Sequence, residues 1–240
     1  MRALVTTLFL GQLILAGCAA QLPPAEMTDD GLERVAARSI GGVYRLPGAS
    51  FLPYHRVMVE PPSISFINDW RKNHPEVNQA EFMRMLAETV TLFREEFTRE
   101  FVELGSYTIA EDPDEDVLLV IPAIEELNIV APDAGDGAGQ RTYTRIPITM
   151  KITGDLRDAA TSKLVGRVVM YHGDTQGFGE MRVQITNRVT NAHEQRLAYS
   201  KWSRLVREAI DVAKAERPRP HKPKPESSTE KPAEIEDSRP

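Results

Sequence analysis

The sequence predicts an α+β fold, a two-layer α/β sandwich in which two helices pack on one face of a mostly antiparallel sheet of about four to five strands. Three observations predict this fold. Apolar residues recur at helical spacing over residues 78–104 and again over residues 191–213, while residues 146–171 alternate apolar and polar side chains on either side of a turn. Helices and strands that each have one apolar side bury those sides against one another, which produces two layers.

The first helix is expected to begin at Asn78, because Asn78 and Glu81 resemble a capping box. Its apolar residues recur every three or four positions: Phe82, Leu86, Val90, Phe93, Phe97, Phe101 and Leu104. Gly105 is the expected stop signal. Phenylalanines at four-residue steps could border a ligand groove, but a stripe that faces the core is the favoured interpretation.

Strands are expected on both sides of this helix. Residues 56–60 alternate apolar and polar side chains and end at Pro61-Pro62, which suits the end of a strand or a sheet edge. Residues 117–121 form a buried strand, which we expect to be interrupted at Pro122 and to continue over residues 127–130.

The strongest strand prediction is an antiparallel hairpin, in which residues 146–156 and 164–171 flank a turn at residues 158–162. A second helix is expected to begin at Asn191, which repeats the N-cap pattern together with Glu194. Its buried face is predicted to comprise Ala198, Trp202, Leu205, Ala209, Val212 and Ala213.

The amino terminus carries the most specific signal in the chain. Met1-Arg2 supplies a positive charge, residues 3–14 are almost entirely apolar, and Leu15-Ala16-Gly17-Cys18 matches a lipobox, in which the cysteine takes a lipid and becomes the mature amino terminus. A plain signal peptide and a transmembrane anchor are the alternatives, but the apolar run is shorter than the roughly 20 residues that span a bilayer. The sequence therefore predicts lipidation of Cys18.

The residues around the cysteine also predict a location. In enteric-type bacteria an Asp after the cysteine tends to retain a lipoprotein in the inner membrane, so Ala19 favours the outer membrane, with the domain facing the periplasm. Cys18 is the only cysteine, which leaves no thiol for a disulfide or a metal site. The net charge is −6, with acids and bases mixed, unlike the clustered basic face of a nucleic-acid-binding protein.

The chain divides into four expected parts. Residues 1–17 are the signal peptide, residues 18–42 a lipidated amino terminus and flexible tether, and residues 43–216 a single α/β periplasmic domain. Residues 217–240, rich in proline and charge, are a disordered tail, because they cannot bury enough apolar surface to fold. Within the tether, residues 31–39 could form a short helix.

Several stretches resemble a family of bacterial lipoproteins known as domain of unknown function 3313. Besides the lipobox, they are residues 54–62 with a Tyr…Val-x-Val strand, residues 116–124, the hairpin turn within residues 154–165, and the helix around Trp202. The turn departs from the family pattern at Ser162, where a glycine is usual. The resemblance implies an outer-membrane-type lipoprotein and brings no catalytic residues, since the family has none assigned.

Two patterns imitate ligand sites. The acidic residues 112–116 begin like a calcium loop, but Val117 and Ala123 occupy the positions that need Gly and Glu, so a solvated turn is favoured. Residues 135–139 carry Gly at alternate positions but join two expected strands and open no helix, which argues against a dinucleotide site.

The remaining candidates are histidines and serines. The histidines lack the spacing of a metal site: His55, His74, His172, His193 and His221. Ser63, Ser200 and Ser203 lack the context of a nucleophile elbow. His172 could lie near a cleft and the basic residues 217–224 could touch an anionic surface, but a polar loop and a solubilising tail are favoured. We therefore expect no catalytic, cofactor or metal site.

These observations favour a non-enzymatic interaction module, a membrane-anchored lipoprotein that binds another envelope protein through a sheet edge or a helix face. The alternative is a lipid- or glycan-binding accessory lipoprotein of an envelope transport system, with the phenylalanine-rich helix beside a cavity. A hydrolase without a recognisable motif is a remote third possibility, because catalytic residues can assemble from distant positions.

Overall fold

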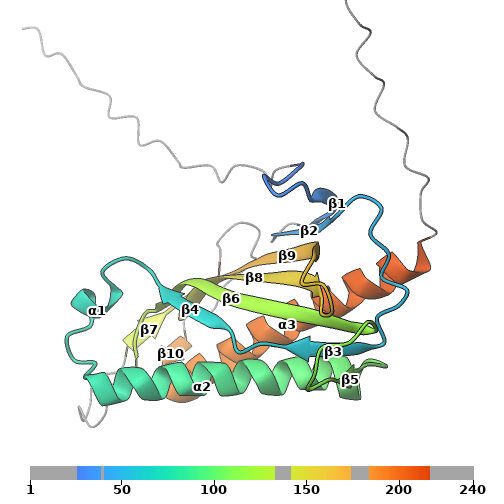
Figure 1. Ribbon diagram of the computed structural model, residues 1–240. Coiled ribbons are helices and arrows are strands. Elements are labelled where there is room, and N and C mark those ends of the chain that lie inside the picture. Colours follow the sequence, from blue (N-terminus) through green and yellow to red (C-terminus); the bar gives the residue numbers. More distant parts are fainter. Residues whose placement is uncertain (1–25, 39–40, 133–141, 174–183, 217–240) are drawn as a thin grey trace, which may run out of the picture.

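The strands form one large mixed sheet and a small second sheet (Figure 1). A computed structural model describes residues 26–38, 41–132, 142–173 and 184–216. The strands are β1 (Glu33–Arg38), β2 (Gly41–Arg45), β3 (Arg56–Val59), β4 (Ser63–Phe66), β5 (Thr108–Ile109), β6 (Val117–Ile129), β7 (Thr142–Thr144), β8 (Ile148–Asp158), β9 (Leu164–His172) and β10 (Gln184–Thr186). The large sheet has the order β1-β2-β9-β8-β6-β3-β5, with β4 also on β6, and β10 pairs with β7.

Helices cover one face of the large sheet. They are α1 (Trp70–Asn73), α2 (Gln79–Thr98), the π-helical segment η1 (Arg99–Glu103) that continues α2, and α3 (Arg188–Ala215). α3 lies across β8 and β9, and α2 lies beside α3 (Figure 1). Alternate residues of β8 from Ile148 to Leu156 are buried beneath the helices, and the residues between them are half-buried on the opposite face. The fold is therefore mixed α/β, with its core between sheet and helices.

The sheet is larger than expected and is mixed rather than mostly antiparallel. It has eight strands instead of four to five. The parallel pairs arise because β3 and β4 lie in tandem along one side of β6, starting from the pairs Arg56↔Val117 and Ser63↔Ala123. These pairings join segments separated by more than 50 residues and an intervening helix. A local sequence pattern therefore cannot predict them.

The short helix expected over residues 31–39 is wrong. Residues 33–38 form β1, which pairs antiparallel with β2 in a register that begins at Glu33↔Arg45 and contains a bulge at Val35. β2 in turn pairs with β9, so β1 is the edge of the large sheet. Pairing with a strand already held in the sheet decides the conformation here, inside the segment that we assigned to the tether.

The interruption expected at Pro122 is also wrong. β6 runs unbroken through Pro122, which pairs with Gly154 of β8. On its other side, Pro122 lies opposite the step between the end of β3 and the start of β4, where a missing N–H donor disrupts no ladder. The irregularity falls instead at Glu126, whose φ of 54° marks a bulge.

The hairpin β8–β9 and the start of α2 are confirmed. The Asn78 side chain accepts a hydrogen bond of 3.0 Å from the Glu81 backbone N–H. The three phenylalanines of the predicted stripe that lie in the core are Phe93, Phe97 and Phe101.

The start predicted for α3 is wrong by one turn. Asn187 caps the helix, and its side chain accepts a hydrogen bond of 3.0 Å from the Thr190 backbone N–H. Asn191 lies inside the helix, where it donates to the Ala131 carbonyl at 3.0 Å.

Candidate functional site

An apolar groove lies between the β1–β2 hairpin and the last turns of α3. Its volume is about 80 Å³. One wall comes from the hairpin, the other from α3, and Phe51 and Leu156 lie between them. The apolar side chains of the two walls are Val35, Ala36, Val43, Leu205, Ala209, Val212 and Ala213. The hairpin forms one edge of the large sheet (Figure 1).

The mouth of the groove is apolar on both sides. Val35 is 48% exposed on the hairpin wall and Val212 is 58% exposed on the α3 wall. Arg45 and Glu216 also line the groove and form an ion pair, with 2.7 Å between Nη2 and Oε2. Two exposed valines facing a common groove, beside an ion pair, are typical of a surface that receives apolar side chains from a partner.

Only the α3 wall of this groove could be predicted from the sequence. Val212 was predicted to lie on the buried face of α3, and it does continue the apolar stripe of that helix. In the structure Val212 lies in the groove rather than in the core, and it is left exposed. The other wall could not be predicted, because residues 33–38 were assigned to the tether rather than to a strand.

A polar network fixes α3 against α2 and η1. Glu96 and Glu100 are buried, and Arg99 binds Glu96 at 2.6 Å. The Ser200 hydroxyl donates to Glu100 at 2.8 Å and accepts from Arg99 at 2.9 Å. Since carboxylates inside a helix interface need partners, this network holds the two helices in one relative position. Sequence reasoning missed it, because both glutamates lie beside the phenylalanine stripe rather than within it.

The lipobox residues Leu15, Ala16, Gly17 and Cys18 lie outside the residues that the structure describes. The same holds for the glycine-rich residues 135–139, for His221 and for the tail at residues 217–240. Lipidation of Cys18 therefore stays a prediction.

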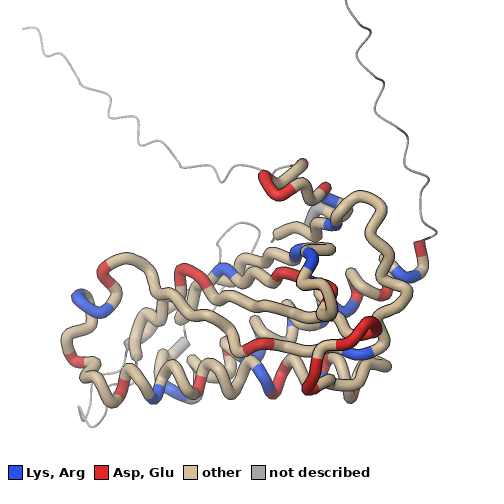
Figure 2. Tube along the Cα trace, viewed as in Figure 1, with Lys and Arg blue, Asp and Glu red and all other residues tan. Residues whose placement is uncertain are grey.

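The acidic turn before β6 binds an arginine. Asp114 lies 2.7 Å from the Arg56 guanidinium, and the Arg56 Nε–H donates to Asp116 at 2.9 Å. The hydrogen bond from the Glu115 N–H, followed by the one from Arg56, lowers the pKa of Asp114. The side-chain hydrogen bond from Arg56 likewise lowers the pKa of Asp116. These carboxylates hold β3 to β6, and Figure 2 shows acidic residues gathered on this turn.

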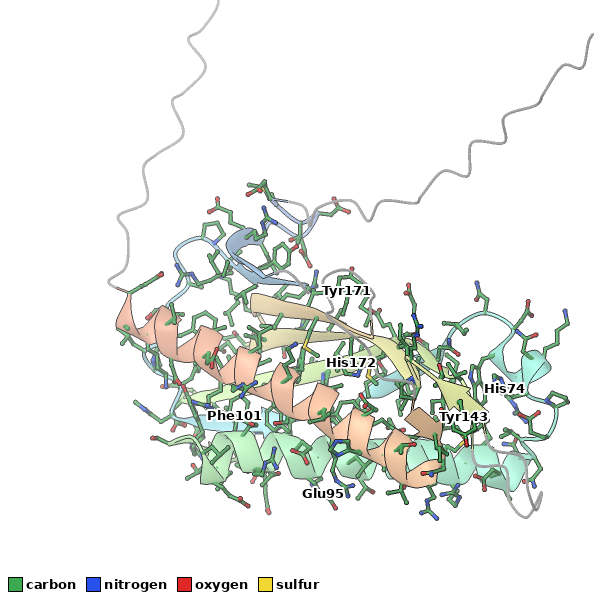
Figure 3. The ribbon with its side chains drawn as sticks, turned by 180° about the vertical axis from the view of Figure 1, so that it is seen from behind. His74, Glu95, Phe101, Tyr143, Tyr171 and His172 are labelled. Atoms are coloured by element: carbon green, nitrogen blue, oxygen red, sulfur yellow. The ribbon has the colours of Figure 1, made fainter. Side chains whose placement is uncertain are left out.

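The structure does not bring the candidate serines to a histidine among the residues it describes. Ser200 binds Glu100, and Ser203 is a fully buried residue of α3. His172 lies 3.6 Å from Glu194 of α3, whereas His74 stacks on Trp70 with 4.4 Å between ring centroids. Figure 3 shows these two histidines on separate elements, β9 and the end of α1. The described residues also contain no cluster of three side chains suited to a metal ion.

None of the helices in the described part of the chain combines the length and apolar content that crossing a bilayer requires.

Comparison with protein-family models finds no match, and comparison with curated proteins also finds none. The resemblance to domain of unknown function 3313 therefore stays a prediction. Solved structures do match. The PelC dodecamer from Paraburkholderia phytofirmans has a TM-score of 0.35 and 10% identity, with 71% of this chain and 97% of that chain covered.

Two further solved structures are similar. A protein of family DUF330 from Xanthomonas campestris has a TM-score of 0.36 and 13% identity, with 70% of this chain and 89% of that chain covered. A neuraminyllactose-binding hemagglutinin homolog from Helicobacter pylori has a TM-score of 0.36 and 9% identity, with 70% and 91% covered. TM-scores below 0.5 establish no shared function.

Proposed function

We propose that this chain is a lipid-anchored protein of the bacterial cell envelope that acts without catalysis, by binding another envelope protein at the apolar groove. The observation that supports the proposal is the groove itself, whose two walls expose Val35 and Val212 to solvent. Exposed apolar surface that borders a concave site favours binding of a partner's apolar side chains.

The partner segment that fits the groove is apolar along the side that enters it and polar outside. Glu208 and the pair of Arg45 and Glu216 lie among the apolar lining residues. Apolar contacts flanked by a few polar groups are common in protein–protein contacts. A volume of about 80 Å³ suits one or two aliphatic side chains of such a segment rather than a whole lipid.

The groove lies close to the proposed anchor. Glu26 is the eighth residue after Cys18, and eight residues span at most about 28 Å when fully extended. Glu26 is adjacent to β1, because its carbonyl accepts a hydrogen bond of 2.9 Å from the Arg34 N–H. A lipid on Cys18 would therefore keep the groove near the outer-membrane surface, so the partner is a membrane protein or one bound close to the membrane.

The test is site-specific photo-cross-linking in cells that produce the full chain. A photoreactive amino acid replaces Val212 or Val35, and the matched control replaces Met83, which is 54% exposed on α2 away from the groove. We expect the same envelope protein in adducts at both valines and not at Met83. Adducts with phospholipid alone would contradict the proposal in favour of the lipid-binding alternative. Identical adducts at all three positions, or none, would also contradict it.

A further inference from the structure

A second hollow lies on the other side of α3. This polar pocket has a volume of about 210 Å³ and lies between the turn at residues 104–107, His55 before β3, and the last turns of α3. Arg207, Asp211 and Lys214 enter it from α3, where spacings of three and four residues place them on one side of the helix. The pocket shares no lining residue with the apolar groove.

The Arg207 guanidinium lies in the pocket and keeps hydrogen-bond donors available for a ligand. Nη1 lies 3.6 Å from an Asp211 oxygen and Nη2 lies 3.7 Å from a Glu100 oxygen, both beyond hydrogen-bond range. Among the described residues none accepts a hydrogen bond from this side chain, and its Nε is buried without a partner. An arginine has five N–H donors, so several remain for a molecule in the pocket.

The surroundings fix these groups before any ligand arrives. Glu100 belongs to the π-helical segment, is 3% exposed and accepts a hydrogen bond from Ser200. A glycine is required at position 105, beside Arg207. A Cβ added to Gly105 would lie 2.8 Å from Cδ of Arg207 and 2.5 Å from the Phe101 carbonyl oxygen. The Tyr107 hydroxyl donates to Asp211 at 2.7 Å. Pre-set polar groups lower the cost of ordering a site on binding.

The balance of charge indicates the class of ligand. Arg207 and Lys214 are offset by Glu100 and Asp211, so the pocket has no excess of positive charge. This arrangement disfavours a phosphate or carboxylate. A guanidinium beside a carboxylate instead pairs with vicinal hydroxyls, which donate and accept at adjacent atoms.

We propose that the polar pocket binds one neutral sugar unit, with its hydroxyls between Arg207 and Asp211. Ser106 offers a further hydroxyl at the rim, and Leu104, which is 61% exposed, offers an apolar contact for the face of the sugar ring. The volume of the pocket suits a monosaccharide unit, either free or at the end of a longer glycan. This site does not depend on the partner proposed for the apolar groove.

The test uses the full chain in a zwitterionic detergent without a sugar headgroup. Saturation-transfer NMR is recorded with glucose, galactose, mannose and N-acetylglucosamine, and with a tetramer of N-acetylglucosamine to separate a free sugar from a glycan. We expect saturation transfer to at least one of these probes. No transfer at about 50 mM of every probe, or competition by inorganic phosphate, would overturn the proposal.

Two variants locate the site. Arg207→Lys keeps a positive charge beside the buried Glu100 but loses the planar fork, so affinity should fall about tenfold. Asp211→Asn, on a side chain 48% exposed, should weaken binding without unfolding the domain. Arg196→Lys is the matched control, because Arg196 is an arginine of the same helix that lies 3.7 Å from Glu95 and outside the pocket. Equal losses in Arg207→Lys and Arg196→Lys would overturn the assignment.

Discussion

The indole ring of Trp202 lies directly against the backbone of Gly154. A Cβ built on Gly154 would lie 2.4 Å from Cζ2 and 2.8 Å from Cη2 of Trp202. Gly154 is on β8 and Trp202 is fully buried on α3, so this contact sets how closely the long helix approaches the sheet. Glycine is the residue that permits it.

We therefore expect Gly154→Ala to lower the free energy of unfolding by about 1–3 kcal/mol, because the added methyl must displace a buried ring. Chemical denaturation measures the change. Thr153→Ala, at the half-buried neighbouring position on the opposite face, should change stability by less than about 0.5 kcal/mol. Combining Gly154→Ala with Trp202→Phe should cost less than the sum of the two single changes. If the two changes in unfolding free energy simply add, the contact between Gly154 and Trp202 is not tight.

Ser162 lies in the left-handed region, with φ of 58°, at the end of the β8–β9 turn. Its side chain makes no hydrogen bond with the described residues, whereas its backbone N–H donates to the Asp158 carbonyl at 2.8 Å. Ser162→Gly should therefore stabilise the domain by up to about 1 kcal/mol, measured by urea denaturation. Ser162→Val should destabilise it, and an increase in stability with valine would rule out backbone strain as the cause.

Asp158 predicts a pH dependence of stability. Its carboxylate accepts hydrogen bonds from the Thr161 hydroxyl at 2.6 Å and from the Tyr54 hydroxyl at 3.0 Å. These bonds, with that of Thr161 the largest contribution, hold the pKa of Asp158 below its ordinary value of 3.8. A pKa that is lower in the folded state adds stability above the ordinary value, and this stability is lost as the pH falls from about 4 through the lower folded pKa.

The Asp158→Asn variant should therefore lose less stability than the parent chain between pH 5 and pH 2, as followed by thermal unfolding. Asp112→Asn is the control, because Asp112 is exposed and makes no hydrogen bond with the described residues. If both variants follow the same pH curve as the parent, Asp158 contributes nothing to acid stability.

Lipidation of Cys18 predicts that replacing this residue changes the membrane fraction in which the chain is found. Cys18→Ala removes the only thiol, so radiolabelled palmitate should no longer be incorporated and the chain should leave the outer-membrane fraction. Ala19→Asp is the companion variant and should retain palmitate while moving to the inner membrane. Palmitate in Cys18→Ala would exclude Cys18 as the attachment site and leave the two ligand-binding proposals to be tested separately.

The parts of the fold that follow from local sequence were predictable. The cap at Asn78, the three buried phenylalanines and the turn between β8 and β9 depend on residues within one helix or one hairpin. Ser162 in that turn adopts the positive φ that favours glycine.

The remaining features depend on pairings between distant residues. Whether residues 33–38 form a strand is decided by β2, which is itself held by β9. The start of α3 was misplaced because Asn187 and Asn191 are each followed three positions later by a polar residue, Thr190 or Glu194, and only the folded chain shows which asparagine is outside the helix. The polar pocket joins residues 55, 104–107 and 207–214, which no spacing rule connects.

The place of β1 at the sheet edge has a mechanical consequence. If lipid on Cys18 holds the chain to a membrane, any tension between membrane and partner enters the domain at Glu26 and reaches β1 before any other strand. β1 is fastened by its ladder with β2 and by the isolated bridge between Met27 and Glu33, whereas Asp30 is tied to Arg167 at 2.7 Å. Since Val35 of β1 also forms one wall of the apolar groove, a pull that peels β1 away would open the groove and release what it holds.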